Sequence, residues 1–374
     1  MPPGNAPSPT PSRRKWRRRL ALAGTLAVIA LLASMLPASA NNGTIWTTLP
    51  SLPTARKDLA SAVAPCPPGQ TGSCVYTVGG GNFATQFTTV ESYNRLTNAW
   101  STLPPLPTAR AALAAAAAPC PAGQTGTCLY AIGGGITAGV GGQYLRVVES
   151  YNPVTNAWST VASLTTARSG LAAATAPCPA GQTGTCVYAV GGWDGTNALG
   201  TVESYNPANN SWSTVRGLTL PRLALGAAAA SCPPGQTGTC VYAVGGYGSS
   251  GFTGVVESYN PATNAWSPMA PVPTPRANAG VAATTCPPGQ SGTCVYVVGG
   301  NNTGSLVANV DAYNPATNAW TALPSLPKPR NLLAAAAMQC PPGITGSCVY
   351  ASGGYTTDIT GTVEALDPPD PSED

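Results

Sequence analysis

The sequence predicts an all-β protein folded as a six-bladed β-propeller, with its ring closed by the N-terminal strand. Two observations carry this prediction. Pairs of cysteines recur every 54 residues, except once at 58, and short strand-like runs lie between turn residues in every repeat. A period near 50 residues with several strands per unit is typical of propellers. The content of 43 glycines and 39 prolines, with 43% hydrophobic and only 8% charged residues, favours a turn-rich β protein over a disordered chain.

The first 40 residues are expected to form an export signal or an N-terminal membrane anchor. Six basic residues lie between Arg13 and Arg19, residues 20–36 are apolar and uncharged, and residues 37–40 read Pro-Ala-Ser-Ala. A positive region, an apolar region and a small-x-small end describe a cleavable signal, and the basic start partly resembles a twin-arginine signal. The apolar run is at the short limit for a membrane span, so cleavage is favoured over a tether through 20–36. Either way, we expect the remainder to be secreted or extracytoplasmic.

The predicted folded part, residues 41–367, has a nearly balanced charge. Outside the N-terminal cluster the chain has 11 basic against 13 acidic residues, several of the latter in an acidic C-terminal tail at 368–374. Phosphate contacts need an excess of cations. We therefore expect no nucleic-acid partner.

The twelve cysteines form six pairs with the constant spacing C-x7-C. Zinc sites prefer shorter spacings and usually histidine, which this chain lacks, whereas an even cysteine count in an exported chain favours disulfides. Proline and glycine between the paired cysteines indicate a hairpin loop closed at its base. We predict no metal site and six local bridges: Cys66–Cys74, Cys120–Cys128, Cys178–Cys186, Cys232–Cys240, Cys286–Cys294 and Cys340–Cys348.

Each repeat contains four short strands in a constant order. The first is small and apolar, as in 113–118; the second, as in 187–190, ends at a Gly-Gly pair; the third, as in 202–205, stops before Asn-Pro; and the fourth, as in 211–214, contains a tryptophan. Alanine-rich runs favour helix in isolation. Here they are short and bounded by arginine and proline or cysteine, and small side chains suit a strand beside a narrow propeller axis.

The order Gly-Gly, Glu-Ser-Tyr-Asn-Pro, Thr-Asn-Ala-Trp and Pro-x-x-Arg resembles the kelch repeat, and the resemblance covers residues 44–367. It implies a kelch-type propeller, although kelch units commonly have a tighter turn where this chain has C-x7-C. Residues 44–50 match a fourth strand, and residues 362–366 match a third strand with no tryptophan after it. We therefore predict that the N-terminal strand completes the last blade, which removes two exposed sheet edges.

Every repeat also contains one arginine and one acid, which we interpret as structural partners that pair between blades. Equivalent copies in every blade serve the fold, whereas a functional site breaks the symmetry. The series are Arg56, Arg110, Arg168, Arg222, Arg276 and Arg330, with Glu91, Glu149, Glu203, Glu257, Asp311 and Glu364.

The chain is interpreted as a binding scaffold and not as an enzyme. Without histidine it has no imidazole base and no histidine metal ligand. It therefore differs from kelch-type copper enzymes such as galactose oxidase, and we expect no cofactor. A carbohydrate-active enzyme, such as a sugar epimerase or mutarotase on the same fold, is the alternative, and a purely structural surface protein is a third interpretation.

The residues that break the repeat lie in the loops between second and third strands. These loops combine aromatic, amide and small side chains, a mixture found in adaptable binding surfaces. The alternative is that the aromatic rings pack onto neighbouring blades. We predict that these loops recognise an extracellular protein, peptide or glycan through Phe83, Tyr144, Trp193, Asp194, Tyr247, Phe252, Asn301 and Tyr355.

Overall fold

The computed structural model describes residues 46–136 and 142–367. The chain divides into two units, residues 1–42 and 43–374, and the described residues all belong to the second. The predicted export signal or anchor and the acidic tail at 368–374 therefore lie outside the described residues. Within residues 46–136 and 142–367, no helix has the length and apolar character needed to cross a membrane.

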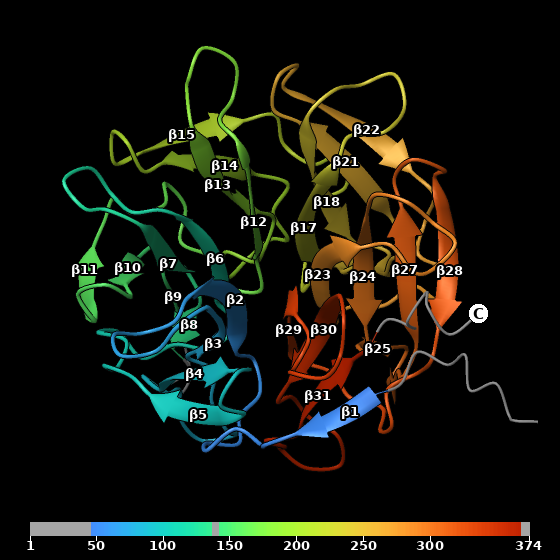
Figure 1. The fold of residues 1–374 in the computed structure, drawn as a ribbon. Coiled ribbons are helices and arrows are strands. Elements are labelled where there is room, and N and C mark those ends of the chain that lie inside the picture. The colour runs from blue at the N-terminus through green and yellow to red at the C-terminus, as the bar shows by residue number, and fades with distance from the viewer. Residues whose placement is uncertain (1–45, 137–141, 368–374) are drawn as a thin grey trace, which may run out of the picture. The chain divides into compact units, whose positions relative to one another are not determined.

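The second unit contains six four-stranded antiparallel sheets set around a common axis, which confirms the predicted six-bladed propeller (Figure 1). In each sheet the strands follow one another in chain order, except in the last, where the order is β1-β31-β30-β29. Each repeat therefore forms one blade, and its first strand lies nearest the axis.

The strands of the blades have the following bounds. Blade 1 comprises β2 (Ala60–Pro65), β3 (Ser73–Val78), β4 (Val90–Asn94) and β5 (Ala99–Thr102); blade 2 comprises β6 (Ala114–Pro119), β7 (Thr127–Ile132), β10 (Val148–Asn152) and β11 (Ala157–Thr160). Blade 3 comprises β12 (Ala172–Pro177), β13 (Thr185–Val190), β14 (Val202–Asn206) and β15 (Ser211–Val215); blade 4 comprises β17 (Gly226–Ser231), β18 (Thr239–Val244), β21 (Val256–Asn260) and β22 (Ala265–Met269). Blade 5 comprises β23 (Gly280–Thr285), β24 (Thr293–Val298), β27 (Val310–Asn314) and β28 (Ala319–Leu323); blade 6 comprises β29 (Ala334–Gln339), β30 (Ser347–Ser352), β31 (Val363–Leu366) and β1 (Trp46–Leu49).

Short two-residue strands lie in the loops between second and third strands and in one connection between blades. They are β8 (Gly135–Ile136) with β9 (Gln143–Tyr144), β16 (Arg222–Leu223) with β19 (Tyr247–Gly248) and β20 (Gly251–Phe252), and β25 (Asn301–Asn302) with β26 (Ser305–Leu306).

The N-terminal strand closes the ring, as predicted. β1 pairs antiparallel with β31, in a register that places Trp46 opposite Leu366 and Leu49 opposite Val363 (Figure 1). The indole of Trp46 also donates a hydrogen bond of 2.9 Å to the carbonyl of Pro324. The first described strand thus occupies the edge of the last blade, and the edge that β31 would otherwise expose is paired.

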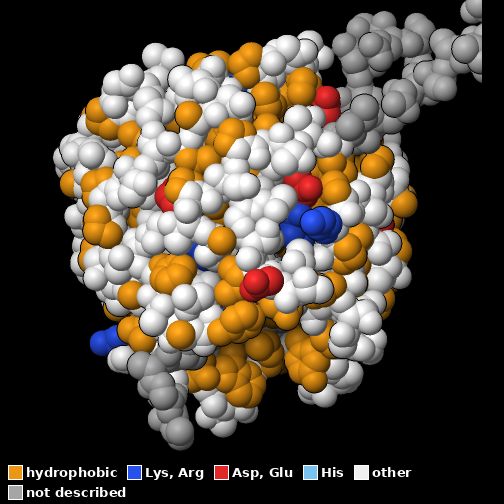
Figure 2. Space-filling model, turned by 90° about the horizontal axis from the view of Figure 1, so that it is seen from below, with side chains coloured by type: hydrophobic (Ala, Val, Ile, Leu, Met, Phe, Trp, Pro, Cys, Tyr) orange, Lys and Arg blue, Asp and Glu red, His pale blue; other side chains and the backbone are white. Residues whose placement is uncertain are grey.

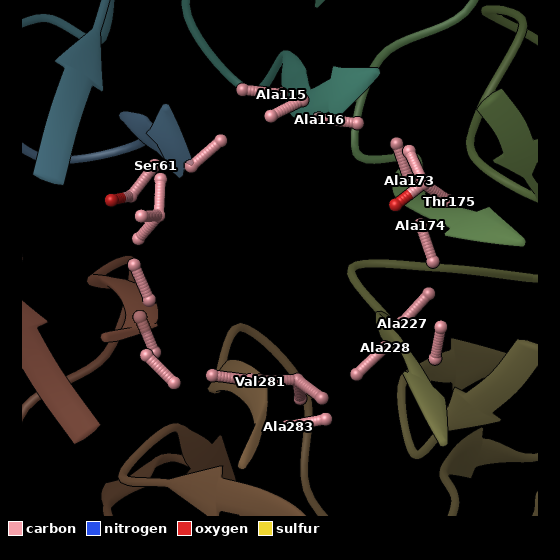
Figure 3. Close-up of a pocket in the computed structure, with 18 residues that line it drawn as sticks. Ser61, Ala115, Ala116, Ala173, Ala174, Thr175, Ala227, Ala228, Val281 and Ala283 are labelled. Carbon is pink, nitrogen blue, oxygen red and sulfur yellow. The ribbon is translucent and has the colours of Figure 1, made fainter. Parts of the chain in front are cut away.

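The alanine-rich first strands line the axis, where they surround a cavity of about 230 Å³ (Figure 3). Adjacent blades approach so closely there that only small side chains fit. A β-carbon added to Gly226 would lie 2.1 Å from Cγ2 of Val281, and one added to Gly280 would lie 2.7 Å from Cβ of Ala335. Packing around the axis therefore overrides the helix propensity of alanine, as expected from the sequence.

The repeat arginines pair with the repeat acids, but within a blade and not between blades as we had expected. Arg110, just before β6, contacts Glu149 on β10 of the same blade at 2.7 Å, and both side chains are buried. Arg168 pairs with Glu203 in the same way and also donates to the carbonyls of Gly191 and Thr201. Each arginine therefore fastens the segment that enters a blade to the third strand of that blade.

All six predicted disulfides are present. Each joins the end of a first strand to the start of a second strand, with Cα atoms 4.7–4.9 Å apart. The loop of blade 1, which the Cys66–Cys74 bond closes, is also anchored by Gln70, whose side-chain oxygen accepts a hydrogen bond of 2.9 Å from the side-chain amide of Asn94. Six such bonds indicate an oxidising, extracytoplasmic location.

A closed circle of backbone hydrogen bonds lies at one end of the axis. Two positions after each repeat arginine, one residue adopts a φ between +51° and +58°, and its amide donates to the carbonyl of the corresponding residue in the preceding blade at 2.7–3.0 Å. Because the amide in the first blade donates to the carbonyl in the sixth, the circle has no end. We call it the mouth ring; its members are Asp58, Ala112, Gly170, Ala224, Asn278 and Leu332.

Candidate binding face

The loops between second and third strands emerge at the end of each blade that carries the mouth ring. Antiparallel bridges join them to the segments entering the blades, as between Lys57 and Gly81 or between Asn331 and Tyr355. The disulfide loops join the first strand to the second and lie at the opposite ends of these strands. We call the surface formed by the loops between second and third strands and the mouth ring the variable-loop face.

The mouth ring surrounds a cavity of about 130 Å³. Four of its members are apolar or glycine, while Asp58 and Asn278 are the polar ones. The carboxylate of Asp58 forms an ion pair of 2.7 Å with the ammonium of Lys57. The side-chain amide of Asn278 donates a hydrogen bond of 2.9 Å to the side-chain oxygen of Asn301. The axis therefore opens onto this face with an asymmetric polar lining.

The structure brings two of the predicted residues together where the first and last blades meet. Phe83 of blade 1 is 72% exposed, and its ring lies edge-on to that of Tyr355 of blade 6, with centroids 5.7 Å apart and planes at 85°. Lys57 places its ammonium 5.4 Å from the centroid of Phe83. We call Phe83, Tyr355, Lys57 and Asp58 the Phe83 cluster.

Sequence reasoning did not select Lys57 or Asp58 for the site, although a signal was present. The residue after each repeat arginine is uncharged in five repeats, and only the first repeat has lysine there, followed by aspartate. That break in the repeat coincides with the unique Phe83 of the same blade. Asymmetry at the positions next to the arginine was therefore as informative as asymmetry in the loops.

A second aromatic pair lies within blade 4. Tyr247 and Phe252 stand opposite each other on β19 and β20, with centroids 5.1 Å apart and planes at 85°. Tyr247 remains 44% exposed. β16, which contains Leu223, pairs with β19 and holds this hairpin against the entry to the blade. The two predicted residues thus form one fixed, partly exposed aromatic group.

The loop of blade 3 shows the packing that we had considered as the alternative to binding. A β-carbon on Gly195 would lie 2.7 Å from Cε2 of Tyr144, so the tyrosine ring of blade 2 rests against the blade 3 loop. Trp193 is half-buried, and its backbone pairs with Ser169. The ring of Tyr144 and the backbone pairing of Trp193 therefore both help to fix the position of the blade 3 loop.

Asp194 and Asn301 have structural partners. Oδ1 of Asp194 accepts the amides of Thr196 and Asn197 at 2.8 and 2.7 Å, and these backbone hydrogen bonds lower the pKa of the carboxyl. Asn301, through Asn278, links the blade 5 loop to the mouth ring. The eight predicted residues thus fall into four places on the variable-loop face: the Phe83 cluster, the blade 4 hairpin, the Asn278–Asn301 contact, and the blade 3 loop, which carries Trp193 and Asp194 and against which Tyr144 packs at Gly195.

Among the described residues, one group of side chains has potential metal-ligating atoms close together, namely Cys340, Cys348 and Asp367. The two cysteines are joined in a disulfide, so they offer no thiolate to a metal. Charged side chains are also sparse on the surface that Figure 2 shows, where they lie among hydrophobic and uncharged groups. The face shown in Figure 2 therefore offers mainly uncharged groups for contact.

Six four-stranded blades, one per sequence repeat, with a closing N-terminal strand and one disulfide in every blade define a disulfide-linked β-propeller built from repeats. The sequence profile of the Kelch motif matches residues 63–107, 116–165, 174–219, 228–273 and 275–327. The chain therefore belongs to the kelch-repeat family.

Relatives in the family are similar over part of their length. Mouse Kelch-like protein 35 is 32% identical over 38% of this chain and 22% of its own length, and Kelch-like protein 25 of Xenopus tropicalis is 26% identical over 74% and 42%. The chain thus spans well under two thirds of these relatives. Among solved structures, that of YjhT matches with a TM-score of 0.60 at 18% identity, covering 84% of this chain and 96% of the other, which shows a shared fold.

Proposed function

We propose that this protein is an extracytoplasmic kelch-repeat scaffold that binds a protein, peptide or glycan through the variable-loop face. The observation that carries the proposal is the contrast between the two ends of the ring. The disulfide loops have nearly the same sequence in every blade, whereas each blade presents different side chains on the variable-loop face. A specific ligand requires such asymmetry.

Exposed aromatic groups at fixed positions support this face as the binding surface. Phe83 and Tyr247 are among the few large hydrophobic side chains exposed in the described residues, and each is held by a second ring. Fixed aromatic side chains supply contact area at low entropic cost and dominate many interfaces. Membership of the kelch family adds general support, because kelch domains commonly mediate binding.

The test is ligand profiling of the exported protein against arrays of secreted proteins, peptides and glycans. For each hit, affinity is compared between the wild type and the substitutions Tyr247→Ala and Trp193→Ala. We expect at least one of them to weaken binding about tenfold, because truncating an aromatic anchor commonly costs more than 1 kcal/mol. Leu96→Ala and Val154→Ala are matched controls, since these side chains are 46% and 63% exposed beside the disulfide loops.

The opposite pattern would refute the choice of face: binding that is unchanged in Tyr247→Ala, Trp193→Ala and Phe83→Ala but lost in the control variants. Circular dichroism confirms that each variant is folded. Glycan hits are also followed by NMR for conversion of the sugar, which measures the alternative function as an epimerase or mutarotase.

A further inference from the structure

We infer that the Phe83 cluster is a subsite for a neutral sugar residue, so that the ligand of the variable-loop face is a neutral glycan. The inference rests on the proposed function and names its ligand class. Its first support is the position of Phe83, which protrudes from the surface with 72% of its area exposed. A peptide anchor typically enters a concave pocket. A protruding flat ring instead suits the C–H face of a pyranose, which stacks on aromatic rings.

The ring of Phe83 is held in place before any ligand binds. Tyr355 meets it edge-on from blade 6, and Lys57 lies against it from the segment that enters blade 1. In the same loop, Oδ1 of Asn82 accepts the amides of Ala84 and Thr85 at 2.8 and 2.7 Å, which fixes the backbone on either side of the ring. A surface organised in advance loses little conformational entropy on binding. The apolar C–H face of a sugar ring can then be bound by one aromatic side chain.

The charges beside Phe83 favour a neutral ligand. Lys57 and Asp58 lie 2.7 Å apart, and their side chains retain 18% and 20% exposure. An anionic ligand on Phe83 would meet Asp58, and a cationic ligand would meet the lysine that already lies against the ring. Hydroxyl groups, by contrast, can accept from the ammonium and donate to the carboxylate. The pair is therefore suited to a polyhydroxylated ligand without net charge.

The cavity at the mouth ring adjoins this pair, because Asp58 belongs to both. Its volume of about 130 Å³ corresponds to roughly four water molecules at about 30 Å³ each. That volume accommodates an exocyclic group of a sugar. Asp58 and Asn278 line this cavity and offer hydrogen-bonding atoms to such a group.

The experiment measures binding of neutral tetrasaccharides (cello-, manno-, xylo- and galactotetraose) to the whole exported protein by saturation-transfer NMR and calorimetry. Tetragalacturonate and chitosan tetramer serve as anionic and cationic probes. We expect one or more neutral probes to bind more tightly than either charged probe. Phe83→Ala should weaken that binding about tenfold, Phe83→Trp should retain it, and Val154→Ala should leave it unchanged. Asp58→Asn, which keeps the side-chain shape, should weaken it less than Phe83→Ala.

Three outcomes would overturn the inference. The first is tighter binding of a charged probe than of every neutral one, and the second is neutral binding that is unaffected by Phe83→Ala. In the third, no tetrasaccharide binds while a protein or peptide binds in a manner sensitive to Phe83→Ala or Tyr247→Ala. That third result would refute the glycan as ligand but leave the variable-loop face established as a binding surface.

Discussion

The amide of Ala112 donates a hydrogen bond of 2.8 Å to the carbonyl oxygen of Asp58, the corresponding residue of the preceding blade. Five further bonds of the same kind complete the mouth ring, and every residue in it has a left-handed backbone. Left-handed geometry costs an L-residue roughly 1–2 kcal/mol relative to glycine. The ring therefore couples all six blades at the expense of local strain in five of them.

Exchanging alanine and glycine within the mouth ring tests this strain. Ala112→Gly should stabilise the protein by about 1 kcal/mol, and Gly170→Ala should destabilise it by about the same amount. A β-carbon on Gly170 would meet its nearest atom at 3.4 Å, so the effect is conformational and not steric. The measurement is urea unfolding. Ala99→Gly, on the exposed strand β5, is the control and should destabilise; if Ala112→Gly behaves like it, the left-handed ring is not strained.

Removing one partner of a buried ion pair should strongly destabilise a blade. Arg168→Met leaves Glu203 charged and buried, and the carbonyls of Gly191 and Thr201 lose a donor, so we expect a loss of about 3–5 kcal/mol in unfolding free energy. Arg216→Met is the matched control because Arg216 is exposed, and it should change stability by less than about 0.5 kcal/mol. Equal effects in the two variants would contradict the structural role assigned to the repeat arginines.

The disulfides should be local, and each should contribute separately to stability. Non-reducing peptide mapping of the exported protein should recover six links, each within one C-x7-C loop. Replacing both Cys178 and Cys186 by serine should lower the unfolding free energy by about 2–3 kcal/mol, since the bond restricts a short loop of the unfolded chain. Links between different repeats, or free thiols in the native protein, would show that the assignment is incorrect.

The buried tyrosines should make the protein sensitive to alkali. Burial raises the pKa of Tyr93, Tyr151, Tyr205 and Tyr259 to about 12, against a usual value of about 10. Below pH 10 the phenols are neutral in both states and their burial favours folding in full. As the pH rises from 10 towards 12, the unfolded chain releases protons that the folded protein retains, so stability falls.

Urea midpoints measured between pH 8 and 12 check this expectation, together with tyrosinate absorbance at 295 nm. Most of the absorbance change should coincide with loss of the β-sheet signal in circular dichroism. Ionisation of the bulk of the tyrosines near pH 10 in a protein that keeps its circular dichroism would refute the assigned burial.

Much of the fold could be predicted from the sequence because each repeat specifies its own blade. The strand order, the disulfide pairs and the closing role of residues 46–49 all follow from spacings within or between repeats, and the structure agrees with them. The pairing of Arg168 with Glu203 was predicted, but its location within one blade was not. A repeat pattern places both residues in every unit without indicating whether the arginine turns towards its own blade or the preceding one.

The sequence by itself determined that this protein is a six-bladed kelch propeller with a disulfide in every blade, because local patterns of turn residues, strands and cysteines recur at one period. Only the tertiary structure decided which of the asymmetric residues meet. Phe83 and Tyr355 lie near opposite ends of the described chain and come into contact because ring closure makes the first and last blades neighbours. Lys57 and Asp58 join them through a contact within blade 1, where the segment that enters the blade pairs with the loop at Gly81; the repeat pattern alone does not indicate that pairing.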